Sequence, residues 1–100
     1  MPANAVRQLD WAPRALQAYI ESLVRIADED PRTAGLVRER VERALDVILE
    51  NPGIGVPTAR RGERRFPIAN TGHVIVYRVT PAAVRIHIWY RARQNVRSQL

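Results

Sequence analysis

The sequence predicts an α+β fold in which an N-terminal strand and an antiparallel helical hairpin pack on a small twisted antiparallel sheet. Two apolar periodicities indicate this fold: steps of three and four residues in the first half of the chain, and steps of two in the second half. The chain has 100 residues, of which 46% are hydrophobic and 26% charged, so we expect one folded domain over residues 1–100.

The first half of the chain is expected to hold one short strand and two helices. Residues 5–10 are assigned to the strand. A helix follows, with Pro13 in its first turn, where a missing N–H costs nothing, and its end near Glu29. Asp30–Pro31 then supplies an N-cap and a first helical residue for a second helix, which Asn51–Gly53 ends. Because only Asp30–Pro31 links the two helices, we expect them to be antiparallel.

The second half is expected to form the rest of the sheet. Gly53–Gly62 contains one proline and three glycines, with a further proline just before it, and is assigned to a loop. Three strands are predicted after it: Arg64–Ile68, which Pro67 marks as an edge or a bulge, then His73–Thr80 and Val84–Tyr90. The short connections between these strands favour antiparallel pairing of neighbours.

Positive charge is concentrated in the second half of the chain. Residues 1–50 contain seven arginines and nine acidic residues, a net charge of −2, whereas residues 51–100 contain nine arginines and one acid, Glu63, a net charge of +8. This asymmetry indicates an anionic partner for the second half, the alternative being the basic side that any small basic protein has.

The composition also bears on the compartment. The chain contains no cysteine, which excludes disulfides and fits a reducing cytoplasm. No apolar run approaches the ~20 residues that cross a bilayer, and the N-terminus does not resemble a signal peptide. We therefore expect a cytoplasmic protein that does not act at a membrane.

Few residues are suited to catalysis. With two histidines, no cysteine and a single acid in the strand half, a metal site is hard to assemble, and no cofactor motif is present. General acid–base cleavage of RNA needs proton carriers and cations that stabilise the reacting phosphate. The available proton carriers are Glu63, His73, His87 and Tyr90, and the available cations are Arg65, Arg78, Arg91 and Arg93. The alternative for each histidine is an ordinary strand residue, and for Glu63 a solvated loop acid.

Two aromatic residues end the last predicted strand. Tyr90 shares its parity with Ile86 and Ile88, which favours packing in the core, although it could also stack on a base. Trp89 has the other parity, so either the C-terminal tail covers it or it is exposed for binding. An exposed tryptophan flanked by arginines is typical of an interface hot spot.

The order of these features resembles the RelE/ParE toxin family, and its ParE ("plasmid stabilisation") branch in particular. The similarity covers residues 5 to 94 and is carried by the following segments: Trp11–Ile20 (WAPRALQAYI), Asp30–Pro31, Leu49–Gly53 (LENPG), Arg64–Ile68 (RRFPI), Thr71–Val79 (TGHVIVYRV) and Ile86–Arg93 (IHIWYRAR).

The resemblance implies a toxin of a type II toxin–antitoxin system, with a fold like that of small microbial ribonucleases. Such a toxin forms an oligomeric complex with a cognate antitoxin, which cancels its activity. RelE-like members cleave mRNA on the ribosome, whereas ParE-like members inhibit DNA gyrase and are not known as nucleases. In this reading the last strand delivers Tyr90, Arg91 and Arg93 to the working edge.

Individual positions favour the binding branch. RelE-like toxins carry basic residues at positions that match Arg65, Pro67, Val74 and Arg93, and a tyrosine that would fall at about Gln99. This chain keeps two of those cations and lacks the tyrosine, and it has Tyr90 where family members often have a histidine.

Three functions are therefore compared. The first is growth arrest by binding DNA gyrase without catalysis, with Arg65, Arg78, Trp89, Tyr90, Arg91 and Arg93 as the target-binding residues. The second is a ribosome-dependent mRNA endoribonuclease in which Arg65 and Arg93 hold the phosphate while His87 or Tyr90 moves protons. The third is an inactive, partner-binding remnant of the fold.

Overall fold

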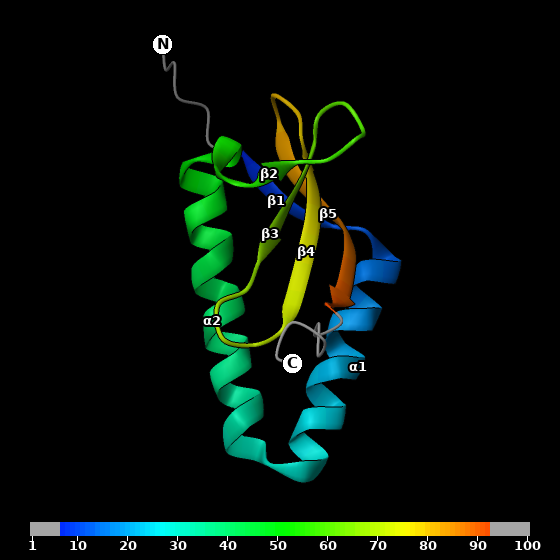
Figure 1. Cartoon of the computed structure of the whole chain (residues 1–100), viewed down its shortest axis with the longest axis vertical. Helices are drawn as coiled ribbons and strands as arrows, with labels where there is room; N and C mark the ends of the chain where they lie inside the picture. Colours follow the sequence, from blue (N-terminus) through cyan, green and yellow to red (C-terminus); the bar gives the residue numbers. More distant parts are fainter. Residues whose placement is uncertain (1–6, 93–100) are drawn as a thin grey trace, which may run out of the picture.

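The chain forms two helices and a five-stranded sheet in a computed structural model that describes residues 7–92 (Figure 1). The elements follow in this order: β1 (Gln8–Trp11), α1 (Pro13–Glu29), α2 (Pro31–Glu50), a 3₁₀ turn η1 (Pro52–Ile54), β2 (Val56–Pro57), β3 (Glu63–Pro67), β4 (His73–Val79) and β5 (Ala83–Arg91). The predicted α+β class, helical hairpin and three C-terminal strands are confirmed.

Proline residues and a capping aspartate determine where the two helices of the hairpin begin. Pro13 opens α1 and Pro31 opens α2. Between the helices, the Asp30 carboxylate accepts hydrogen bonds from the backbone N–H of Arg32 (3.1 Å) and from the Thr33 hydroxyl (2.8 Å). The first bond satisfies a backbone N–H that the start of α2 leaves free, and the second holds the Asp30 carboxylate in place, so a single residue suffices to reverse the chain.

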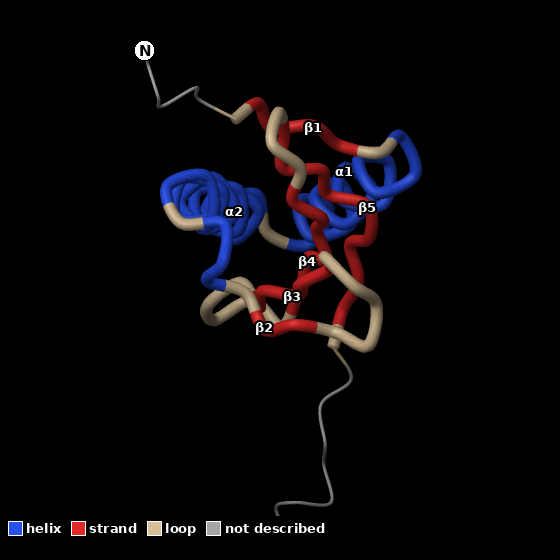
Figure 2. Tube along the Cα trace, turned by 90° about the horizontal axis from the view of Figure 1, so that it is seen from above, coloured by secondary structure: helices blue, strands red, loops and turns tan. Residues whose placement is uncertain are grey.

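The sheet has the strand order β1-β5-β4-β3-β2 (Figure 2). Strands β3, β4 and β5 are antiparallel neighbours, as predicted, and β2 also pairs with β3 in an antiparallel manner. Strand β1 lies beside β5 in parallel, with Gln8 opposite Ala83 and Trp11 opposite Ile86, so the sheet is mixed. Strand β1 also lies slightly later than the expected 5–10. The predicted loop at 53–62 contains η1 and the two-residue strand β2, which pairs with β3.

A β-bulge in β5 decides which side chains enter the core. Tyr77 pairs with Ile86 and Val76 pairs with Ile88, so His87 is the extra residue between them. Before the bulge, Val84 and Ile86 are fully buried; after it, Trp89 is buried, whereas Ile88 and Tyr90 are exposed. The expectation that Tyr90 shares the core with Ile86 is therefore wrong, because an unbroken period of two does not hold across a bulge.

The core lies between the two helices and one face of the sheet. Side chains from both helices pack there against strands β4 and β5. These buried residues include Ala15, Val37, Val41, Leu45, Ile48, Ile75, Tyr77, Val84, Ile86 and Trp89. Within residues 7–92, neither helix is long and apolar enough to pass through a bilayer.

Candidate functional site

The face of the sheet turned away from the helices carries three rows of cross-strand neighbours, and we call it the outer face. Alternation along each strand and the register between strands place its residues. The first row is Asp10, Arg85, Arg78 and Glu63; the second is Ile88, Val76, Arg65 and Val56; the third is Tyr90, Val74 and Pro67.

Two positive charges on the outer face lie where they lower the stability of the fold. Arg78 lies directly opposite Arg85, and both side chains are exposed. Like charges in directly opposed positions destabilise a strand pair. Asp10 forms an ion pair with Arg85 from β1, and Glu63 lies opposite Arg78 in register. An arrangement of this kind favours an external anion that would share the two guanidinium groups.

The second and third rows add one arginine and an apolar floor. Arg65 is exposed opposite Val76, whose side chain is 6% exposed. Val74, 4% exposed, lies between Pro67 and Tyr90, and Tyr90 is 39% exposed. The outer face therefore presents guanidinium groups beside partly exposed apolar side chains, as protein-binding surfaces commonly do.

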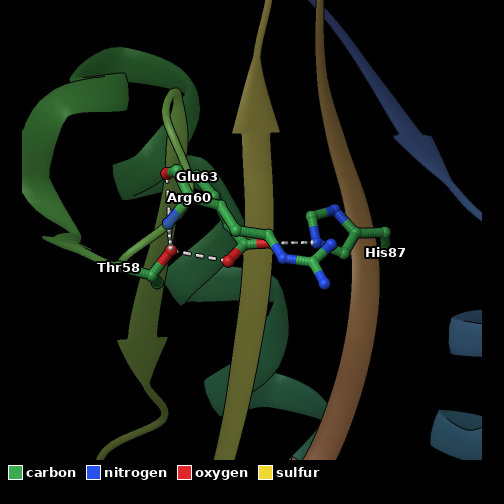
Figure 3. Close-up of polar contacts among 4 residues, drawn as sticks. All are labelled: Thr58, Arg60, Glu63 and His87. Carbon is green, nitrogen blue, oxygen red and sulfur yellow. Dashed lines mark hydrogen bonds and ion pairs between the residues drawn. The ribbon is translucent and has the colours of Figure 1, made fainter.

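A buried carboxylate joins two segments at one end of the outer face (Figure 3). Glu63 is 7% exposed; one carboxylate oxygen accepts a hydrogen bond from the Thr58 hydroxyl at 2.6 Å, and the other lies 2.7 Å from Nε2 of His87. The Thr58 hydroxyl in turn accepts a hydrogen bond from the backbone N–H of Arg60 at 3.1 Å. Glu63 is thus neither a solvated loop acid nor unpaired.

These contacts determine the protonation of Glu63. The hydrogen bond from Thr58 is the main cause that lowers the pKa of the Glu63 carboxyl, and His87 and Arg60 lower it further, against the opposing effect of burial. The group is therefore an anion near neutral pH. A carboxylate bonded to an imidazole fixes the ring's orientation, so Glu63 holds His87 at the bulge.

The structure divides the predicted site residues between the two faces of the sheet. Arg65, Arg78 and Tyr90 share the outer face, and Arg93 lies outside the described residues. Trp89 is covered by α1, and its Nε1–H donates to the Ser22 hydroxyl at 2.9 Å.

Two further predicted residues lie on the side of the helices. His73 pairs in register with Arg91, and both line a pocket together with residues of α1. His73 is therefore separated by the sheet from Arg65 and Arg78, whereas His87 reaches the outer face through Glu63.

Two residues of this face were not predicted. Arg85 belongs beside Arg78, which follows from the register across the short β4–β5 connection. Thr58 holds Glu63 in place from the segment between β2 and β3, and no pattern in the sequence indicates that contact. Among residues 7–92, no three histidine, aspartate or glutamate side chains gather in a way that could hold a metal ion.

A second surface is apolar and lies along the helical hairpin. A groove of about 310 Å³ is lined by Leu23, Val24, Ala27, Ala34, Gly35 and Arg38. Large apolar side chains beside it are exposed to an unusual degree: Val24 by 57%, Ile20 by 49% and Leu36 by 44%. Exposed apolar surface concentrated in one place marks a contact site for another molecule.

Comparison with known proteins identifies the family. The protein-family model that describes the ParE toxin of the type II toxin–antitoxin system parDE matches residues 9–95 of this chain. The chain belongs to the ParE toxin family. It is 31% identical to toxin RelE1 of Caulobacter vibrioides over 86 residues, which cover 82% of this chain and 90% of RelE1. It is 30% identical to the putative toxin Y4kP of Sinorhizobium fredii over 74 residues, 74% of this chain and 77% of Y4kP.

Solved structures confirm the fold. The chromosomal ParDE TA system of P. aeruginosa contains a chain that superposes with a TM-score of 0.75 at 16% identity, covering 89% of this chain and 99% of that one. The predicted membership of the RelE/ParE family is confirmed, and with it the general function: this chain is a toxin of a type II toxin–antitoxin system.

Proposed function

We propose that this ParE-family toxin arrests growth in the cytoplasm by binding DNA gyrase through the outer face, without catalysis. The observation that carries the proposal is the placement of Arg65, Arg78 and Arg85 as exposed cations on one face of the sheet. Two of them oppose each other across β4 and β5, and the apolar floor beside them suits a protein partner better than a free polyanion.

The centre of the outer face supports binding over cleavage. Pro67 and Val74, which match basic positions of RelE-like toxins, lie side by side in the third row. Each group that stabilises charge in a transition state contributes about 3 kcal/mol, so two missing cations correspond to a loss of about 10⁴ in rate. A nuclease with this face would be slow, whereas a binding surface does not need those charges.

We further propose that a cognate antitoxin neutralises the toxin along the helical hairpin. The apolar groove between α1 and α2 would take an apolar helix face, and the arginines of the second half of the chain attract an acidic segment. A segment that folds as it binds can cover both surfaces at once. The solved chromosomal ParDE TA system of P. aeruginosa, which contains a chain of this fold, supports such a partner.

A gyrase assay tests the target. Purified toxin should inhibit supercoiling and accumulate gyrase–DNA cleavage complexes, and the antitoxin should reverse both effects. Arg65→Gln and Arg78→Gln should each raise the concentration needed for half inhibition at least tenfold, because an interfacial arginine can contribute more than about 1.4 kcal/mol. The matched control is Arg43→Gln, which removes an exposed charge from α2 and should change inhibition less than twofold.

Three outcomes would contradict this target. If purified, folded toxin has no effect on gyrase, the proposal is wrong. If Arg43→Gln and Arg78→Gln lose the same amount of inhibition, the outer face contributes only the general attraction between opposite charges. Harmless expression of folded toxin in the absence of its antitoxin would instead identify an inactive remnant.

The second candidate is a ribosome-dependent endoribonuclease, and the Glu63–His87 pair favours it. A carboxylate 2.7 Å from an imidazole nitrogen is a suitable acid–base arrangement, and Arg78 lies opposite Glu63 in register. Primer extension on ribosome-bound mRNA should then show cuts within codons that disappear in His87→Gln. Intact mRNA under growth arrest would exclude this function.

A further inference from the structure

A small polar pocket lies on the side of the sheet opposite the outer face, between α1 and the ends of β4 and β5. Its volume is about 120 Å³, and it is lined by Ser22, Arg25, Ile26, Glu29, His73 and Arg91. Two of these residues, His73 and Arg91, are among the predicted site residues, but the proposed contact of the outer face with gyrase does not use this pocket. Its size corresponds to one small group and not to a segment of a partner chain.

His73 is the unusual member of this pocket. It is 4% exposed and stacks on Trp89 with ring centroids 4.7 Å apart and an interplanar angle of 15°. Its Nδ1 is buried and has no hydrogen-bond partner among residues 7–92. A buried polar atom without a partner costs roughly 1–3 kcal/mol, so native proteins rarely keep one unless something binds there.

The ring of His73 is neutral near pH 7. Burial is the main cause that lowers its pKa, and the guanidinium groups of Arg91 and Arg25 lower it further, against the opposing effect of a hydrogen bond with the backbone of Thr71. Neutral imidazole carries one N–H, and His73 lines the pocket, so its ring can contribute a donor there. Both arginines line the same pocket as the ring.

Ser22 supplies another donor. Its oxygen accepts the indole N–H of Trp89 at 2.9 Å, and within residues 7–92 its own hydroxyl hydrogen is not donated to any group. The pocket therefore combines the hydroxyl of Ser22, the imidazole of His73 and the guanidinium groups of Arg25 and Arg91. These four side chains come from α1, β4 and β5 and line the same pocket.

We propose that this pocket binds a phosphate group. Four converging donors, two of them guanidinium groups, suit a tetrahedral oxyanion better than a planar carboxylate with two oxygens. Glu29 completes the selection, because its carboxylate can accept the proton that a phosphate monoanion carries near neutral pH. Sulfate has no such proton, so Glu29 repels it.

This site is independent of gyrase binding. The sheet separates it from Arg65, Arg78 and Arg85, and its occupation would connect α1 with the ends of β4 and β5. Loss of phosphate binding would therefore leave the gyrase result unchanged, and the reverse also holds.

Titration of the full-length toxin with inorganic phosphate tests the proposal. The titration runs at constant ionic strength in a phosphate-free buffer, with calorimetry for affinity and NMR for the two imidazole rings. Phosphate should shift the ring signals of His73 and leave those of His87 unchanged, because His87 is bonded to Glu63. A nucleoside monophosphate, sulfate and an acidic peptide form the parallel arms. Phosphate should bind at least tenfold more tightly than sulfate.

Substitutions localise the site. Arg25→Gln and Arg91→Gln should each weaken phosphate binding at least tenfold, whereas Arg14→Gln, an exposed arginine of the same helix, should change it less than twofold. Glu29→Gln should retain phosphate binding but reduce the preference over sulfate to less than twofold. Tighter binding of the nucleoside monophosphate than of free phosphate would identify a nucleotide as the source of the group.

Other results would overturn the proposal. Unchanged His73 signals, or equal losses in Arg14→Gln and Arg25→Gln, would reduce binding to the general attraction of a basic protein for anions. Displacement of phosphate by the acidic peptide at lower concentration would assign the pocket to a carboxylate of a protein partner.

Discussion

The hydroxyl group of Tyr77 is expected to contribute a large share of the stability of this toxin. Tyr77 is fully buried in β4, and its hydroxyl accepts a hydrogen bond from the N–H of Gly55 at 2.9 Å and donates one to the carbonyl of Pro52 at 2.7 Å. It thereby fixes the segment that carries η1 and β2 to the edge of the sheet. A methyl group at Gly55 would lie 2.6 Å from the same oxygen, so this contact leaves no space for a larger residue.

Tyr77→Phe keeps the ring and removes both hydrogen bonds. The buried N–H of Gly55 would lose its partner at a cost of roughly 1–3 kcal/mol, and the half-buried carbonyl of Pro52, which water can reach, would add less than about 1 kcal/mol. We expect a total loss of about 2–3 kcal/mol. For a domain of this size, that loss lowers the Tm by roughly 10–20 °C.

Thermal and urea unfolding, followed by circular dichroism, measure this loss. The matched control is Tyr90→Phe, because Tyr90 lies on the exposed outer face and its hydroxyl has no hydrogen-bond partner among residues 7–92. It should unfold within about 0.5 kcal/mol of the parent protein. A Tyr77→Phe protein as stable as this control would refute the reasoning, since the two hydrogen bonds would then contribute nothing measurable.

Three further predictions concern stability. Gly35→Ala should raise the free energy of unfolding by about 0.5–1 kcal/mol in urea titrations, because Gly35 lies inside α2 and an added methyl group meets no atom within 4 Å. The same methyl group narrows the apolar groove and should weaken antitoxin binding. The pKa of His73 is lowered in the folded protein, so below the ordinary histidine pKa of about 6.5 the unfolded chain binds a proton that the folded chain does not. The free energy of unfolding should therefore fall as the pH falls, with a slope of up to about 1.4 kcal/mol per pH unit. His73→Phe should remove that slope, and an unchanged slope in this variant would show that another group causes it. Arg78→Gln should leave the free energy of unfolding within about 0.5 kcal/mol of the parent, because repulsion from Arg85 opposes the attraction of Glu63. A loss above about 2 kcal/mol on urea unfolding would show that Arg78 stabilises the fold.

The helices could be predicted from the sequence because their signals are local. Asp30 caps α2 as expected, and the prolines at both helix starts act within one turn. Apolar spacing of three and four residues correctly indicates the buried side of α2. In α1 the same spacing includes Leu16 and Ile20, which are exposed, so it indicates the buried side of that helix only in part. Strand β1 was harder to place, because four residues carry little periodicity and its parallel pairing with β5 depends on residues more than seventy positions later.

The outer face could be predicted only in part, because it depends on register and on one bulge. Arg65 and Arg78 were correctly placed on neighbouring strands, and their common face follows from simple alternation. Trp89 and Tyr90 exchange places relative to a regular strand, since the extra residue His87 shifts the alternation by one. Only contacts between distant segments, such as Glu63 with His87, decide where that residue falls.

The bulge also explains how one short strand serves two surfaces. Without it, Tyr90 would follow Ile86 into the core, and Trp89 and Arg91 would turn to the outer face. With it, Trp89 reaches Ser22, Arg91 reaches the pocket beside His73, and the outer face gains Ile88 and Tyr90. Deletion of His87 would remove the extra residue and leave Ile86 and Trp89 on the same face of a regular strand, so Trp89 should stay in the core and the loss of stability should come mainly from the missing contact with Glu63. The Glu63 carboxylate that holds His87 therefore positions both surfaces, because it fixes the point at which the strand changes sides.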